Sequence, residues 1–193
     1  RALLLAFALT ELLIEGGERV GLVGEGPTSA NRDTVQKIAL TLIRKRIDSD
    51  TFPSLPPRVR MNRFSECILF SDFLDPPAEI AQSLEHIAAQ GVRGHLVQIL
   101  DPAEETLPYN GRVEFLGIES GERMLAVRAE NLRDAYAERI AAQKEAVASL
   151  ARRFEWSHLL HHTDRPAGEA LLALHTHLSG LSRNYRAKAK ASQ

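Results

Sequence analysis

The chain has 193 residues, of which 44% are hydrophobic and 25% charged, and its formal net charge is −1. This length suits one domain with its own core, and the near-neutral charge provides no overall field to attract nucleic acid or an anionic membrane. The single cysteine, Cys67, cannot form an internal disulfide, which favours a reducing, cytoplasmic location. Residues 2–14 are apolar but fall short of the roughly 20 needed to span a bilayer, so we expect a core helix there.

The first third of the chain reads as two helices around a short strand. Residues 1–15 are rich in Leu and Ala and are followed by two glycines, a usual helix stop. A short β-type run follows at 19–24. Apolar residues at helical spacing predict a second helix over 32–46. Three prolines within 48–60 then indicate a surface connection.

The middle of the chain predicts a βαβ unit. Residues 66–71 contain an unbroken apolar run, which is typical of a strand buried on both faces of a parallel sheet. A helix over 77–90 and a second strand over 94–100 follow it. We therefore expect the runs 19–24, 66–71 and 94–100 to be parallel neighbours or near neighbours in one sheet, with helices on both faces.

The last part predicts a β-hairpin from 112–118 and 123–127, then a long helix over 131–154. A final strand over 156–162 and a final helix over 167–178 complete the alternation. The expected fold class is thus α/β, with an open, doubly wound, mostly parallel sheet and a small β-hairpin excursion.

We expect a single domain over 1–181. Residues 182–193 carry several basic side chains and should form a flexible tail, because none of them is a large aliphatic residue.

Ligands of open parallel sheets bind beyond the carboxyl ends of the strands. Asp72 directly follows the strand 66–71, so its carboxylate should lie at that edge. A hard cation such as Mg²⁺ would bind it together with the hydroxyls of Thr28 or Ser29. Helix capping is the alternative for each of these residues, because Asp, Ser and Thr before helices accept backbone N–H bonds.

The histidines at 158, 161 and 162 are the densest group of potential metal ligands. Strand alternation places His158 and His162 on one face and His161 on the other, so we do not expect a zinc site. Cys67 lies in an apolar strand and should be unreactive. The sequence suggests no nucleophile paired with a base.

Several stretches resemble the bacterial family called domain of unknown function 58, a branch of the von Willebrand factor A-like fold. They are RALLLA (1–6), GGERVGL (16–22), FSDFLD (70–75), LRDAY (132–136), HTDRP (162–166) and EALLAL (169–174). The resemblance implies a metal-ion-dependent adhesion site. In this site Asp72 would be the third-loop aspartate, and Thr28 or Ser29 would match the second-loop threonine.

The first-loop DxSxS motif of that site is not in this sequence, which opens at what resembles the helix after it. We therefore expect the first strand to lie upstream, and Mg²⁺ binding to require it. The resemblance also implies cooperation with a MoxR-type AAA ATPase.

The expected function is a non-enzymatic protein-binding module that engages its partner through the loops carrying Glu25, Asp75 and Asp101. One alternative is a metal-dependent hydrolase using Asp72, Asp75, nearby hydroxyls and the histidine group. Another is a purely structural part of a larger assembly.

Overall fold

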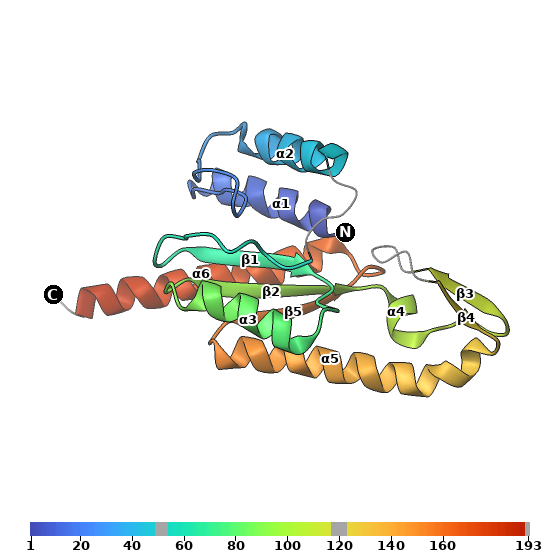
Figure 1. Cartoon of the computed structure of the whole chain (residues 1–193). Helices are drawn as coiled ribbons and strands as arrows, with labels where there is room; N and C mark the ends of the chain where they lie inside the picture. The colour runs from blue at the N-terminus through green and yellow to red at the C-terminus, as the bar shows by residue number, and fades with distance from the viewer. Residues whose placement is uncertain (49–53, 117–122, 192–193) are drawn as a thin grey trace.

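The computed structural model describes residues 1–48, 54–116 and 123–191 (Figure 1). Helices and strands alternate over most of this length. In chain order the elements are α1 (Ala2–Glu15), α2 (Thr34–Asp48), β1 (Glu66–Ser71), α3 (Pro77–Ala88), β2 (Arg93–Leu100), α4 (Pro102–Thr106), β3 (Val113–Leu116), β4 (Arg123–Ala126), the 3₁₀ turn η1 (Ala129–Leu132), α5 (Arg133–Arg153), β5 (Ser157–His162) and α6 (Ala167–Ala191).

The sheet consists of β1, β2 and β5 in the order β1-β2-β5, and both pairings are parallel. In the register, Leu69 of β1 lies beside Leu96 of β2, which lies beside His158 of β5. Seven of the eight residues of the central strand β2 are buried. Burial on both faces is typical of a central strand of a parallel sheet. The pairing of β1 with β2 confirms that 66–71 and 94–100 are parallel neighbours.

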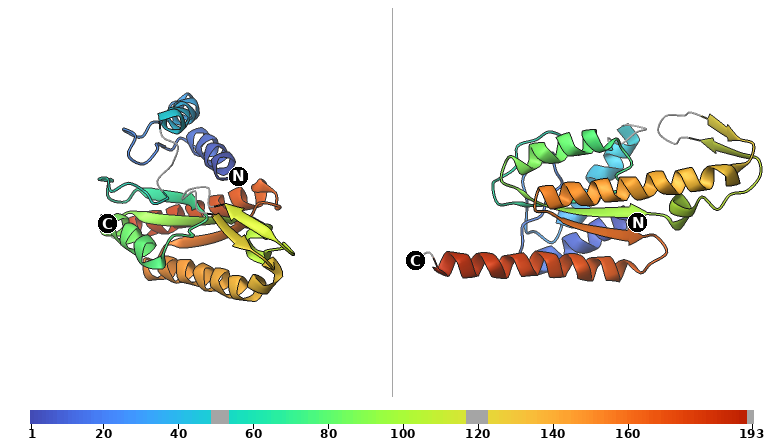
Figure 2. Two further views of the ribbon diagram at one scale, coloured as in Figure 1. Left: turned by 45° about the vertical axis from the view of Figure 1, so that its right-hand side comes forward. Right: turned by 90° about the horizontal axis from the view of Figure 1, so that it is seen from below.

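Helices cover both faces of the sheet, as Figure 2 shows. On one face, α3 and α5 pack Ile80 and Val147 into a cluster with Leu96. On the other, α1 and α6 contribute Leu5 and Leu174 to a second buried cluster. The α/β class and the helices on both faces are therefore confirmed.

The predicted strand at 19–24 is wrong. Only a single antiparallel bridge, between Val20 and Ser29, forms in this region, and it is not joined to the sheet. Gly21 and Gly24 explain the difference, because glycine leaves no side chain to bury and Gly24 adopts a left-handed φ of +83°.

Two helices differ from the sequence prediction: the last helix is longer than expected, and one short helix was not expected. The last helix continues to Ala191 instead of ending near residue 178, and the Ala, Lys and Arg residues of that stretch are strong helix formers. The short helix α4 was missed. Its start is encoded by Asp101 and Pro102, an N-cap followed by proline at the first helical position.

The antiparallel pair β3–β4 confirms the predicted hairpin, although its turn lies outside the described residues. Figure 1 shows the pair extending past the ends of the three parallel strands. We call residues 109–116 and 123–132 the arm. None of the helices within the described ranges combines the length and apolar character needed to cross a membrane.

Candidate functional site at the carboxyl edge of the sheet

The three parallel strands end at Ser71, Leu100 and His162, and their carboxyl ends point to the same side of the molecule (Figure 1). The loops that follow them form what we call the carboxyl edge. Side chains of Arg1 and Asp101 tie this edge together, because both bond to Thr163 after β5. In open parallel sheets this edge is where ligands bind.

The loop after β1 holds Asp72 in a fixed position. Its Oδ1 accepts the backbone N–H of Leu74 at 3.2 Å, so the residue forms an Asx turn. The next residue, Phe73, is buried and has a φ of +53°. The Gln143 side chain donates to the carbonyls of Phe73 and Asp75, at 2.6 and 2.8 Å. The loop is therefore ordered, and the Asp72 carboxylate is exposed.

A fully buried glutamine links this loop to the opposite strand of the sheet. Gln98 on β2 donates to the carbonyl oxygen of Asp72 at 2.9 Å, and its Oε1 lies 3.2 Å from Nε2 of His158. Burial is the main cause that lowers the pKa of His158. The imidazole is consequently neutral near pH 7.

Asp101 is a helix cap. Its side chain accepts the N–H of Ala103 at 2.9 Å, while Glu104 bonds back to the Asp101 N–H and completes a capping box at α4. The hydroxyl of Thr163 also donates to it, and this bond is the first cause of its lowered pKa, followed by the Ala103 N–H. Of the two interpretations left open for such residues, the structure supports capping here.

Beside Asp101, Glu105 joins two elements at the same edge. Lys144 of α5 lies 2.5 Å from its Oε1 and His162 of β5 lies 2.7 Å from its Oε2. Burial alone would raise the pKa of Glu105, but the hydrogen bonds from Lys144 and His162 outweigh it and lower that pKa.

The loop with Glu25, Thr28 and Ser29 lies elsewhere. Since Arg1 is at the carboxyl edge and α1 leads away from it, this loop sits at the opposite end of α1 (Figures 1 and 2). Ser29 contacts Val20, and Glu25 pairs with Lys45 of α2. The structure therefore does not bring these three residues to the carboxyl edge.

The residues present do not fit the Mg²⁺ site that the family resemblance implies. Asp72 is at the carboxyl edge as predicted, but Thr28 and Ser29 are not beside it. Within the described part of the chain, no group of three or more His, Cys, Asp or Glu side chains could hold a metal ion. We derive no metal-dependent step.

The histidines divide between the faces as alternation requires. His158 and His162 contact Gln98 and Glu105, whereas His161 is in the cluster of side chains toward α6. Cys67 is buried, and that burial raises its pKa to about 11.

Sequence reasoning missed a hydrogen-bonded chain across all three strands. The ring of His95 lies 2.7 Å from Ser157 Oγ through Nδ1 and 2.9 Å from Glu66 Oε2 through Nε2. Arg93 also pairs with Glu66, at 2.5 Å. The connectivity resembles a serine hydrolase triad with the ring nitrogens exchanged. Because the His95 side chain is only 1% exposed, a substrate could not reach this base, and we interpret the chain as structural.

The arm presents apolar side chains beyond the carboxyl edge. Leu116, Leu125 and Val127 are 59%, 52% and 71% exposed. Strand alternation and the pairing of Leu116 with Arg123 place Leu116 and Leu125 on one face. Val127 follows directly after β4, and we call these three side chains together the outer face of the arm. Charged groups frame it, since Arg123 pairs with Glu114 on the same face.

These features define an α/β protein with a short parallel sheet, a polar carboxyl edge and an apolar arm. A family model described as "Protein of unknown function DUF58" matches residues 1–146. The chain therefore belongs to the DUF58 family, as its sequence motifs predicted. No curated protein and no solved structure matches it.

Proposed function

We propose that this chain is a non-enzymatic, protein-binding module of the von Willebrand factor A-like class, and that its partner docks on the outer face of the arm. The observation that carries the proposal is the exposure of Leu116 and Leu125 together on one face, with the exposed Val127 directly after the same strand. Fully burying an aliphatic side chain is worth about 1.5–3 kcal/mol. Exposed apolar clusters with a polar rim mark interaction surfaces.

The root of the arm supports this role because it is held in place before any partner arrives. Arg133 donates to the carbonyls of Leu107 and Tyr109 and to the Asn110 side chain. At the same position Glu130 accepts the N–H of Gly111 at 2.8 Å. A preorganised surface loses less conformational freedom on binding.

The carboxyl edge supplies further polar groups at the same end of the molecule as the arm (Figure 1). Asp72 is exposed in its ordered loop, and Asp75 accepts a hydrogen bond from Ser54 at 2.8 Å. Charged groups at the rim of an interface favour specificity and the association rate over affinity. We assign Asp72 and Asp75 to this rim.

A MoxR-type AAA ATPase is the partner we propose, on the basis of the family resemblance and of membership in the DUF58 family. The bacterial cytoplasm is the proposed location. The single, buried and unpaired Cys67 supports a reducing compartment.

The experiment is a pulldown of a purified MoxR-type AAA ATPase with the full chain. The test variant combines Leu125→Ser and Val127→Ser. The matched control is Leu172→Ser, a leucine 69% exposed on α6 and outside the arm. We expect the arm variant to lose binding at least about tenfold, since it removes two buried contacts of the complex.

The control should bind like the wild type, and all three proteins should unfold at the same urea concentration. Equal capture of the wild type and the arm variant would rule out the arm as the docking surface. Capture by none of the three would rule out this partner.

A further inference from the structure

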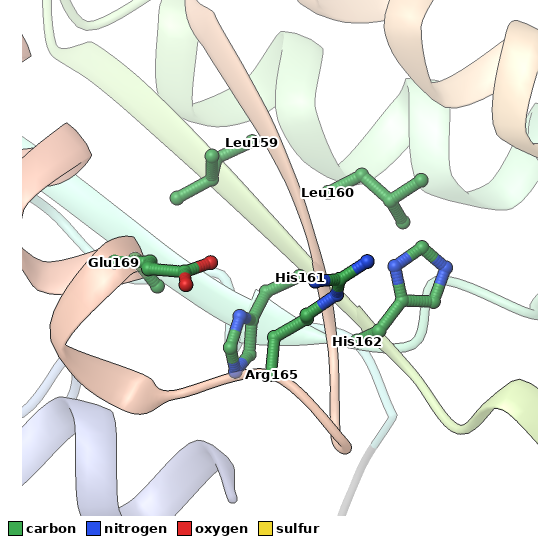
Figure 3. A pocket seen from close by; sticks show the side chains of 7 residues that line it. Leu159, Leu160, His161, His162, Arg165 and Glu169 are labelled. Carbon is green, nitrogen blue, oxygen red and sulfur yellow. The ribbon is translucent and has the colours of Figure 1, made fainter.

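A cavity of about 140 Å³ opens at the carboxyl edge between β5 and the start of α6. Its lining includes His161 and His162 at the end of β5, Arg165 in the connecting loop and Glu169 in the first turn of α6 (Figure 3). One water needs only ~10–15 Å³. The volume therefore admits a small organic molecule.

The cavity wall contains a polar atom without a partner. His161 is only 4% exposed, and no described residue offers a hydrogen bond to its Nε2. Leaving such a nitrogen unpaired in a protein interior is costly. A polar molecule in the cavity would satisfy it.

His161 is uncharged at neutral pH. Burial is the first cause of its lowered pKa, and electrostatic interactions with Arg1 and His162 add to the effect. A neutral imidazole offers one N–H donor and one acceptor nitrogen. His161 can therefore bond either a donor or an acceptor of a ligand.

Charges of both signs surround this ring. The guanidinium of Arg165 makes no hydrogen bond or ion pair with any described residue, and α6 presents the positive end of its dipole at the same place. Glu169 contributes a carboxylate, and Figure 3 shows the His161 ring between it and Arg165. A plain anion would be repelled by Glu169, whereas a molecule with an acidic and a donor group would match both sides.

We propose that this cavity binds a small carboxylate that carries a hydroxyl or amino group beside its carboxyl group. Arg165 and the start of α6 hold the carboxylate, Glu169 accepts from the hydroxyl or ammonium, and His161 Nε2 forms the remaining hydrogen bond. This site is separate from the outer face of the arm and does not depend on the proposed partner.

The test uses the full chain with labelled histidines and follows the His161 ring signals by NMR during titration. The probes are glycolate and glycine, with acetate as the probe that lacks a donor group. We expect saturation with glycolate or glycine at a dissociation constant of about 1 mM, and about tenfold weaker binding of acetate. Arg165→Gln should weaken glycolate about tenfold.

Three further variants test the roles assigned to Glu169 and His161 and provide a control. Glu169→Ala should remove the preference for glycolate over acetate. His161→Phe, followed through the ring signals of His162 in the same lining, should weaken the binding of glycolate and glycine. His175→Phe makes the same exchange at an exposed position of α6 and should change nothing. No saturable shift with any probe would mean that the cavity holds solvent only. Equal binding of acetate, or unchanged binding by Arg165→Gln, would also overturn the proposal.

Discussion

The sheet and the arm both carry aliphatic side chains, but these are buried in the sheet and exposed on the arm. On β2 every residue after Arg93 is buried, because helices cover both faces of the sheet. On β4 three of the four residues are exposed, and they lie on both faces of the strand, because the described residues leave most of the hairpin uncovered. A two-stranded hairpin cannot bury both of its faces by itself.

The comparison separates stability from recognition. A leucine in the sheet has already left water when the chain folds, so its burial stabilises the fold. A leucine on the outer face of the arm still contacts water, and its burial is available to a partner. Substitutions in the two regions should therefore differ in what they change.

The largest expected contrast is between two leucines. Leu96→Ala, at a position with 0% exposure, should lower the free energy of unfolding by about 2–5 kcal/mol, because it leaves a cavity beside Trp156 and Val147. Leu125→Ala on the arm should change it by no more than about 0.5 kcal/mol. Urea unfolding of both variants measures the difference, and equal losses would show that the arm belongs to the folded core.

A smaller contrast is expected between two glycines. A Cβ at Gly94 would lie 1.9 Å from the Trp156 ring, so Gly94→Ala should cost about 1–3 kcal/mol through overpacking. Gly111 at the root of the arm has open space but a φ of +71°, and Gly111→Ala should cost about 1 kcal/mol through backbone strain. Thermal unfolding ranks the two, and a neutral Gly94→Ala would mean that the Trp156 ring moves aside.

The smallest expected effect is a pH dependence confined to the sheet. Burial lowers the pKa of both His158 and His161 in the folded chain. The unfolded chain therefore binds more protons once the pH falls below about 6.5, and stability should decline from there down through the lowered pKa values. Residues 109–132, which include the arm, contain no histidine.

Urea midpoints at about pH 7.5 and about pH 5.5 test this sign. Asp101 and Glu105 do not affect this comparison. Their pKa values are lowered in the folded chain, so these carboxylates reduce stability only when they are protonated in more acidic solution. The variant His158→Gln should have a smaller difference between the two midpoints than the wild type. A higher midpoint at the lower pH would contradict the expected sign.

Local sequence patterns were sufficient to predict an element where its structure depends on the residues of that segment alone. The run at 66–71 has the unbroken apolar character of a strand covered on both faces, and 94–100 was predicted as the strand that follows it in a βαβ unit; both are strands. The alternation of the histidines at 158, 161 and 162 likewise follows from strand geometry. At 19–24 the same kind of reasoning failed, because this short, glycine-rich run pairs only through one bridge, between Val20 and Ser29, and does not join the sheet.

The candidate sites depended on residues far apart in the chain. Asp72 could be placed from the sequence because it follows a strand directly, whereas the position of Thr28 and Ser29 depends on the direction of α1. His95 meets Ser157 only because β2 pairs with β5 in one register, 62 residues apart. The cavity at His161 requires β5 and α6 to meet.

The sequence by itself determined the family, the α/β class and the strands of the sheet, since each rests on motifs or periodicity within a few residues. Tertiary structure alone decided which side chains share a face, a cavity or a hydrogen bond. Strand register and helix packing set those distances, and they result from burying the whole core at once rather than from any single segment.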